Sequence, residues 1–304
     1  MALMLGWRLG ISAVLIPAVL ALFWVDAWQG HRATILLMFC SLLSIRCSYE
    51  ITQLLTVRMM RPSFGLTAIC GLMIVIAGWL HTLMKLPTGN LQLLVSLGWI
   101  GAALVVSFTL LLLREATRFH TPGGSMESLG AGWLAVMYGG GLLAVAGQFR
   151  WYPSPELGYF AIGSMIIAVK SGDTTAYTFG RLWGRRKLTP SLSPGKTWMG
   201  AVGAVGGSIA GSGLWLRFGG QLFQAAPVVS SYTAVILYGA ALGVIGLAGD
   251  LCESLIKRDV EQKDSAALMP GFGGLLDLLD SVLFAAPFAL AFWVLWPPAV
   301  VYSN

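Results

Sequence analysis

Charged side chains are scarce in this sequence of 304 residues: Asp, Glu, Lys and Arg make up only 11% of it, whereas hydrophobic residues make up 57%. Soluble domains are about 25% charged. A water-soluble globule, a disordered chain and a nucleic-acid-binding module are therefore excluded. The mean hydropathy of +0.77, the 38 Gly and the 12 Trp are typical of an integral membrane protein, in which Gly allows close helix contacts and Trp lies at interfaces.

Cysteine and histidine are also rare, with four and three copies. The cysteines are Cys40, Cys47, Cys70 and Cys252, and they form no CxxC pair and have no His cluster beside them. This pattern argues against a zinc site or a disulfide framework and predicts buried thiols that take no part in chemistry.

Long apolar runs make up most of the chain, and strand-like alternation is absent. We therefore predict an all-α fold, a polytopic bundle of about nine transmembrane helices. The apolar segments are 9–25, 33–45, 65–80, 91–113, 129–147, 157–169, 198–216, 228–249 and 281–297. The second and sixth are short for a full crossing and are expected to tilt or to extend into their flanks. The Gly-rich stretch 201–213 places small residues at helical spacing and predicts close packing against a neighbouring helix.

Lys and Arg are distributed unevenly between the two sides of this bundle. Fifteen of the nineteen fall on the side that contains the N-terminus and two long charged loops, 170–197 and 250–280. The positive-inside rule places that side in the cytoplasm and the C-terminus outside. We expect an integral protein of the inner (cell) membrane. Its N-terminal and middle transmembrane helices occupy residues 1–160, and a C-terminal transmembrane region, residues 161–304, carries both loops.

The two loops hold seventeen of the 32 charged residues. Loop 170–197 has six cations and one acid, and its RLWGRRK run fits either a solvated topogenic loop or contact with anionic lipids. Loop 250–280 has seven acids, which topology does not require, because Asp and Glu contribute little to orientation.

The acids of the second loop occur in pairs with helical spacing. Asp277 and Asp280 are three residues apart, as are Asp250 and Glu253, so each pair shares one face of a helix. Carboxylates held together at membrane depth are costly unless a cation lies between them. Hard oxygen ligands of this kind suit Mg²⁺.

Groups that bind phosphate lie next to these acids. Lys257, Arg258 and Lys263 lie between the two pairs, and a Gly-rich turn at 270–274 offers backbone N–H groups to an anion. The first loop adds Lys196 and Asp173. Together these features predict a site for a metal-bound polyphosphate.

The same residues carry a family resemblance. Residues 249–280 read GDLCESLIKRDVEQKDSAALMPGFGGLLDLLD, and residues 173–200 read DTTAYTFGRLWGRRKLTPSLSPGKTWMG. Both resemble signature blocks of the phosphatidate cytidylyltransferase family (the CDP-diacylglycerol synthases), and the similarity covers about residues 170–281. Four positions depart from the family pattern, because Phe272 replaces His, Leu278 replaces Arg, Met199 replaces Glu and Thr175 replaces Gly. More loosely, Glu50 matches a family tendency, and we expect it to be a structural ion-pair partner.

The resemblance implies the reaction of CTP with phosphatidate to give CDP-diacylglycerol and pyrophosphate. It implies Mg²⁺ together with a second cation such as K⁺, a homodimer, and no nucleic-acid partner. The implied catalytic residues are Lys257, Arg258, Asp277 and Asp280, and the implied metal ligands are Asp250, Asp277 and Asp280. The implied substrate-binding residues are Asp173, Lys196, Ser254, Lys263, Asp264, Gly273 and Gly274.

Two alternatives remain open from the sequence. A CTP-dependent enzyme acting on another lipid acceptor would use the same metal and polyphosphate chemistry. A membrane transporter would place charges inside several spans, whereas here the charges collect at one predicted cytoplasmic mouth, which favours an enzyme.

Overall fold

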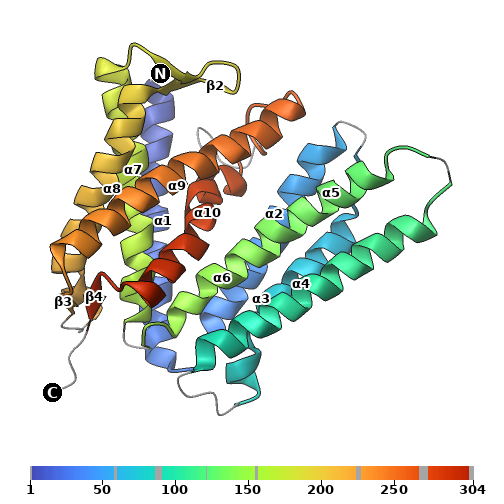
Figure 1. Cartoon of the computed structure of the whole chain (residues 1–304), viewed down its shortest axis with the longest axis horizontal. Coiled ribbons are helices and arrows are strands. Elements are labelled where there is room, and N and C mark those ends of the chain that lie inside the picture. Colours follow the sequence, from blue (N-terminus) through green and yellow to red (C-terminus); the bar gives the residue numbers. More distant parts are fainter. Residues whose placement is uncertain are drawn as a thin grey trace. The chain divides into compact units, whose positions relative to one another are not determined.

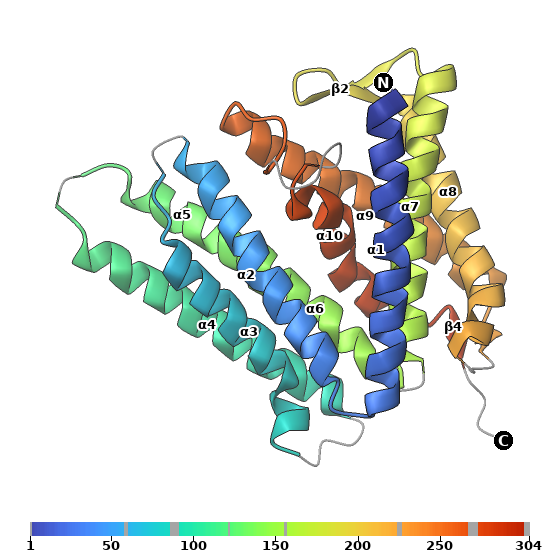
Figure 2. The same cartoon turned by 180° about the vertical axis from the view of Figure 1, so that it is seen from behind.

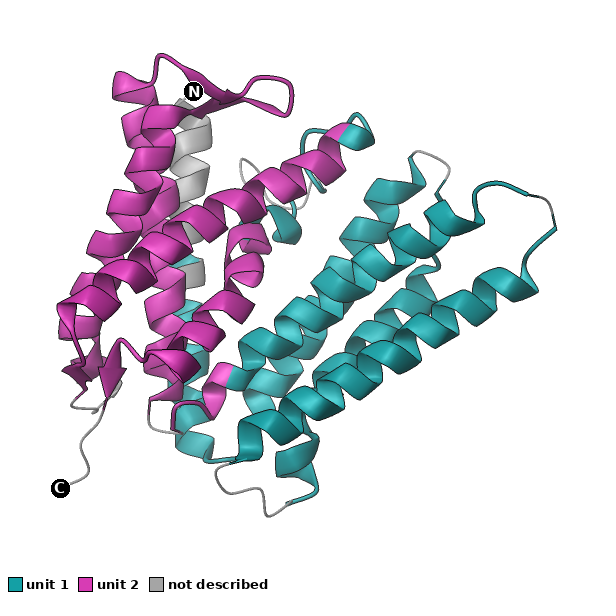
Figure 3. Ribbon diagram, in the orientation of Figure 1, with its two compact units in different colours: residues 1–148, 259–278 teal, residues 149–258, 279–304 magenta. Residues whose placement is uncertain are grey.

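The computed structural model describes residues 2–57, 60–85, 91–120, 122–154, 157–223, 227–266 and 273–300, without the side chains of residues 2–13, 15, 16 and 223. The chain forms two compact units that are interleaved in sequence (Figure 3). Unit 1 comprises residues 1–148 and 259–278, and unit 2 comprises residues 149–258 and 279–304. The predicted division into residues 1–160 and 161–304 concerns function and stays a prediction.

Unit 1 is built from long apolar helices, of which α2 to α6 lie side by side (Figures 1 and 2). They are α1 (Ala2–Gln29), α2 (Thr34–Thr56), α3 (Phe64–Leu83), α4 (Gln92–Thr117), α5 (Ser125–Val136) and α6 (Leu143–Gly147), with a π-helical turn at Met137–Leu142 between the last two. Buried polar bonds fix the turn that joins the first two helices. Asp26 Oδ1 accepts from Leu36 N at 3.0 Å, and Trp79 Nε1 donates to Ala33 O at 3.1 Å.

Unit 2 contains the remaining helices, one short hairpin and a second short strand pair whose strands lie far apart in the sequence (Figure 1). Its elements are α7 (Gly158–Trp183), β1 (Lys187–Thr189), β2 (Ser193–Thr197), α8 (Trp198–Phe218), β3 (Val228–Val229), α9 (Tyr232–Asp259, of which the last residue belongs to unit 1), the greater part of α10 (Leu275–Leu295) and β4 (Ala299–Val300). The strands pair antiparallel, β1 with β2 and β3 with β4. The β1–β2 hairpin precedes α8 and strand β3 follows it, so the hairpin and the β3–β4 pair lie at opposite ends of that helix.

The predicted tight packing of residues 201–213 is confirmed. Gly203 and Gly207 lie four residues apart on the face of α8 that meets α7, and a Cβ at either position would collide with Thr175. The Thr175 hydroxyl uses this closeness to donate to Gly203 O at 2.7 Å. Small residues therefore allow the two backbones to approach, as helix contacts in membranes require.

The two charged stretches predicted as loops are each about half helical, which corrects that expectation. Helix α7 continues through residue 183, α9 continues to residue 259, and α10 begins at residue 275. A polar side chain ends an apolar span without ending the backbone hydrogen-bond ladder. On α7, the hydroxyls of Thr174 and Thr178 donate hydrogen bonds to the carbonyl oxygens four residues earlier. The two short apolar segments, 33–45 and 157–169, extend into their flanks in the same way.

Every predicted apolar segment falls mainly on helix, although segment 228–249 begins with strand β3, and the all-α membrane fold is confirmed. Among the described residues, seven helices are long and apolar enough to cross a membrane: Thr34–Thr56, Phe64–Leu83, Gln92–Thr117, Ser125–Arg150, Trp198–Leu222, Tyr232–Asp259 and Leu275–Leu295. Helices α1 and α7 are not among these seven, and α7 carries Lys170, Asp173 and Arg181 in its second half. The count of nine spans therefore stays a prediction.

The predicted orientation can be tested with cysteines at the two ends of unit 2. Ser191, between β1 and β2, and Ser230, after β3, are both exposed. We expect a membrane-impermeant maleimide to label Ser230→Cys in intact cells and Ser191→Cys only after permeabilisation, because the positive-inside rule places the basic hairpin in the cytoplasm. The parent chain is the control, since Cys40, Cys47 and Cys70 are buried. Labelling of both variants in intact cells would contradict the orientation. The C-terminal residue, Asn304, is predicted to lie outside the cell, but it is not among the described residues.

Candidate active site

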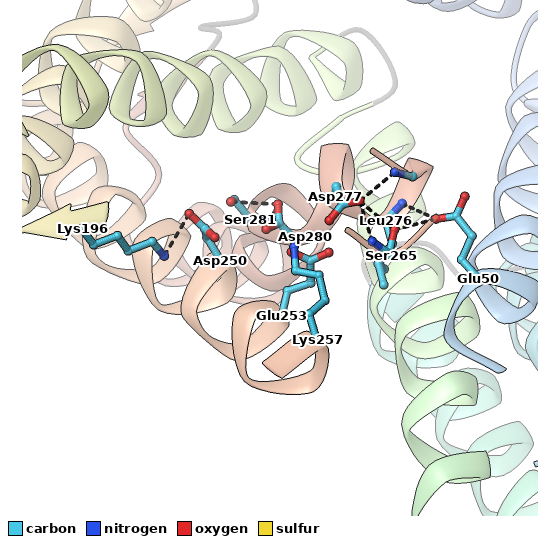
Figure 4. A network of polar contacts seen from close by, with 11 residues as sticks. Glu50, Lys196, Asp250, Glu253, Lys257, Ser265, Leu276, Asp277, Asp280 and Ser281 are labelled. Carbon is cyan, nitrogen blue, oxygen red and sulfur yellow. Dashed lines mark hydrogen bonds and ion pairs between the residues drawn. The ribbon is translucent and has the colours of Figure 1, made fainter. Parts of the chain in front are cut away.

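Three carboxylates converge in unit 2. Asp250 and Glu253 lie on α9 and Asp280 lies on α10, and one oxygen atom from each lies within 4.8 Å of the others. Glu253 is 1% exposed and Asp280 is 4% exposed, whereas Asp250 is half-exposed. Figure 4 shows the three side chains pointing toward one another. We refer to them as the acidic group.

Local geometry explains why these residues meet. Asp250 and Glu253 are three residues apart and share a face of α9. At the adjacent Gly249, a Cβ would lie 2.7 Å from the Cβ of Phe284 and 3.3 Å from Asp280 O, so only glycine lets α9 and α10 cross this closely. The carboxylate of Asp280 is oriented by Ser281, whose N and Oγ donate to Oδ1 at 2.5 and 3.0 Å.

Lysines surround the acidic group. Lys196 Nζ, from strand β2, lies 2.9 Å from Asp250 Oδ2, and Lys257 Nζ lies 2.5 Å from Glu253 Oε2, one turn along α9 (Figure 4). The arrangement places an ammonium group beside two of the three clustered carboxylates, so a bound metal polyphosphate would find ligands for the cation and for its phosphates in one place.

The donor set fits a divalent metal ion. Three carboxylates are hard oxygen ligands, and two of them are buried, where negative charges repel each other strongly unless a cation compensates them. These residues could hold a metal ion. Glu253 was not among the predicted ligands, although its spacing from Asp250 was a signal for it.

A second carboxylate network lies in unit 1. Glu50 lies near the C-terminal end of α2 and is 0% exposed. Its carboxylate accepts from Leu275 N at 3.0 Å, from Leu276 N at 2.9 Å and from Ser265 Oγ at 3.1 Å. Arg46 Nη2 lies 2.8 Å from Glu50 Oε1, which confirms the expected ion pair. Glu50 therefore binds the first N–H groups of α10, where a helix has donors without intrahelical partners.

Asp277 belongs to the same network. Its Oδ2 accepts from Ser265 N at 2.9 Å, from Ser265 Oγ at 2.9 Å and from Gly274 N at 2.7 Å (Figure 4). Asp277 and Glu50 together hold residues 265 and 274–276 against α2. The acidic group does not include Asp277 among its members, and the N–H of Gly274, predicted to contact substrate, is engaged by Asp277.

The other predicted site residues occupy varied positions. Asp173 pairs with Lys170 at 3.1 Å on α7, and Ser254 is buried one residue after Glu253. Arg258, Lys263 and Asp264 are exposed and lie between Glu253 and Asp280 along the chain. Gly273 has a φ of +88°, which favours glycine. Of the four positions that depart from the family pattern, Phe272 lies outside the described residues, and Thr175, Met199 and Leu278 lie within them.

Comparisons with known proteins identify the family of this chain. The model of the "Cytidylyltransferase family" matches residues 7–296. The chain is 30% identical over 299 residues to a phosphatidate cytidylyltransferase of Haemophilus influenzae, covering 95% of this chain and 99% of that protein. Proteins of the same name from Bacillus subtilis and Brucella abortus are 34% identical over 184 residues and 35% identical over 146 residues. These two matches cover 60% and 48% of this chain, and 65% and 51% of the relatives. The match of the family model over nearly the whole chain places this protein in the cytidylyltransferase family.

Proposed function

We propose that this membrane protein transfers the cytidylyl group of CTP to phosphatidate, giving CDP-diacylglycerol and pyrophosphate for phospholipid synthesis. The observation that carries the proposal is the acidic group of Asp250, Glu253 and Asp280 with Lys196 and Lys257 beside it, in a chain of this family. The name of the Haemophilus influenzae relative, which the chain matches over almost its full length, supplies the substrate class.

The reaction does not require a strong general base from the protein. The nucleophile is a phosphate monoester oxygen, which is ionised near neutral pH because its second pKa is about 6. The protein must instead bring two anions together in line and compensate the charge that develops on the leaving pyrophosphate. A site of carboxylates and lysines meets these demands, and no described residue has to act as a nucleophile.

We assign the metal to the acidic group. Bound there, Mg²⁺ would supply charge neutralisation for the triphosphate. Asp250, Glu253 and Asp280 would hold it, and we also propose that the reaction uses a second cation such as K⁺. Carboxylate and phosphate oxygens together provide the ligands that Mg²⁺ prefers.

The cations of the chain bind the phosphates. Lys196 and Lys257 pair with the carboxylates that would hold the metal, and their ammonium groups would bind phosphate oxygens of CTP or phosphatidate. Arg258 follows Lys257 at the end of α9 and adds a forked donor.

The network in unit 1 suggests a positioning role. We assign Asp277 to holding the segment between Ser265 and Gly274, because three donors already occupy its Oδ2. Lys263, Asp264 and Gly273 flank that network and keep their predicted role as substrate contacts, as do Asp173 and Ser254 in unit 2. We further propose that the protein is a homodimer in the inner (cell) membrane. Its two charged stretches lie in the cytoplasm, and it has no nucleic-acid partner. Membership of the family disfavours the transporter.

The position of the label in CTP tests the reaction and separates it from a CTP-dependent kinase. Purified protein is incubated with phosphatidate, Mg²⁺ and CTP labelled on either the α- or the γ-phosphorus, and lipid is then extracted. We expect only the α-label in the lipid phase and the γ-label in pyrophosphate, because cytidylyl transfer breaks the bond between the α- and β-phosphates. Diacylglycerol and polyprenol serve as control acceptors. Lipid carrying the γ-label, or activity with a control acceptor alone, would contradict the proposal.

A further inference from the structure

Four exposed cations in unit 2 take no part in the acidic group. Arg181 lies near the end of α7, Arg185 and Arg186 follow that helix, and Lys187 begins β1. None of the four forms an ion pair with a carboxylate in the described part of the chain. We call them the basic rim. An isolated cluster of four positive charges creates a local field that attracts anions.

Exposed aromatic side chains surround the basic rim. Tyr177, Trp183 and Trp198 are 64%, 56% and 51% exposed. Arg181 Nη1 donates to Tyr177 Oη at 3.1 Å, and the guanidinium carbon of Arg186 lies 6.0 Å from the ring centroid of Trp198. Tyr and Trp with an apolar body and a polar tip are enriched at the level of lipid headgroups.

The start of helix α8 sets the depth of the basic rim. Trp198 is the first residue of a candidate membrane span of 25 residues, Trp198–Leu222. A helix of that length is about 37 Å long, whereas the hydrocarbon core is about 30 Å thick, so its first turn reaches the headgroups. Val202, one turn further along, is exposed on the same face as Trp198. Trp198 N donates to Arg186 O at 3.1 Å, which fixes Arg186 at the same depth.

The basic rim is held by the same hairpin that reaches the acidic group. Lys187 pairs with Thr197 across β1 and β2, and Gly184 packs so closely on Thr197 that a Cβ there would collide with it. The neighbouring residue Lys196 extends from β2 to Asp250. A lipid phosphate bound at the basic rim would therefore lie beside a strand that already contacts the acidic group.

We propose that the basic rim is a docking surface for the phosphates of anionic lipids in the surrounding leaflet, which concentrates phosphatidate at the entrance to the acidic group. The identity of that lipid rests on the proposed function. Phosphatidate carries a phosphomonoester of charge about −1.5 to −2 at neutral pH, more than a phosphodiester headgroup carries. Membrane topology alone would require positive charge here, but not exposed aromatic rings fixed beside the charges at headgroup depth.

The test compares two triple variants of the full chain in nanodiscs of neutral phosphatidylcholine that contain a small fraction of phosphatidate. R185Q/R186Q/K187Q removes three charges from the basic rim. R32Q/K85Q/R217Q removes three exposed cations elsewhere and is the matched control. We expect the rim variant to raise the apparent KM for phosphatidate about tenfold, since each cation near an anionic surface contributes to binding. Its KM for CTP and its kcat should stay within about twofold of the parent, because the acidic group is intact.

Lipid binding is measured separately from turnover. Native mass spectrometry of the same proteins, titrated with phosphatidate and phosphatidylcholine, should show fewer bound phosphatidate molecules for the rim variant and an unchanged number for the control. An unchanged KM for phosphatidate, a raised KM for CTP, or equal loss in both variants would overturn the docking surface. A parent that binds phosphatidate through the basic rim but forms no product would leave the docking surface standing and refute the proposed function.

Discussion

Asp280→Asn is expected to lower turnover about a hundredfold or more at saturating CTP and phosphatidate, the scale of losing a principal stabiliser of charge. The substitution keeps the size of the side chain and leaves an oxygen that can accept from Ser281. It removes one of the three negative charges of the acidic group, so the affinity for Mg²⁺ should fall while the fold persists. Initial rates over a range of Mg²⁺ concentrations measure the effect.

Two comparisons show whether the loss concerns the metal. Raising Mg²⁺ should partly restore Asp280→Asn, and binding of Mn²⁺ followed by electron paramagnetic resonance should weaken in parallel. Asp277→Asn should also lose activity, but Mg²⁺ should not restore it, because Asp277 binds backbone N–H groups and is not a member of the acidic group. Glu127→Gln, at an exposed carboxylate of α5, is the neutral control. If Asp280→Asn matches the parent at limiting Mg²⁺, the metal assignment is wrong.

Hydropathy located the helices because burial in lipid requires apolar side chains and satisfied backbone groups. It misjudged where helices end. The second half of α7 carries Lys170 and Asp173 and was therefore predicted as loop, yet the backbone ladder continues through these residues to Trp183. The polarity of a side chain reports on its surroundings, whereas the end of a helix depends on backbone partners that composition does not reveal.

The site could be predicted in part for a similar reason. Asp250 and Asp280 stood out because carboxylates are costly at the mouths of apolar spans, and helical spacing also linked Asp250 to Glu253. The hydrogen bonds of Glu50 to α10 could not be predicted from the sequence, because its partners Leu275 and Leu276 lie more than two hundred residues further along the chain. Its ion pair with Arg46, four residues away, was local and was expected. Sequence patterns reveal contacts one helical turn apart more readily than contacts that only the fold creates.

Gly274→Ala is expected to cause the other large loss, through packing rather than charge. Gly274 is buried, and a Cβ at this position would collide with Ser265 Oγ and with Glu50 Oε2. Neither side chain can easily move away, because Ser265 also binds Asp277 and Glu50 also binds the first N–H groups of α10. Forcing a methyl group into such a site typically costs about 1–3 kcal/mol. We expect a lower thermal unfolding midpoint in detergent and turnover reduced roughly tenfold to a hundredfold, since lost positioning of about an ångström can have such an effect.

Two further variants separate this packing effect from a general intolerance of alanine. Gly206, on α8, has open space where its Cβ would lie, so Gly206→Ala should keep the parent's midpoint and turnover. In the double variant Ser265→Ala/Gly274→Ala, the hydroxyl that obstructs the new methyl group is gone, and the unfolding midpoint should recover part of the loss. That recovery would be non-additive, as expected for two residues in direct contact. If Gly274→Ala behaves like Gly206→Ala, residues 274–276 are not held against Glu50 in the way that the hydrogen bonds of Leu275 and Leu276 indicate.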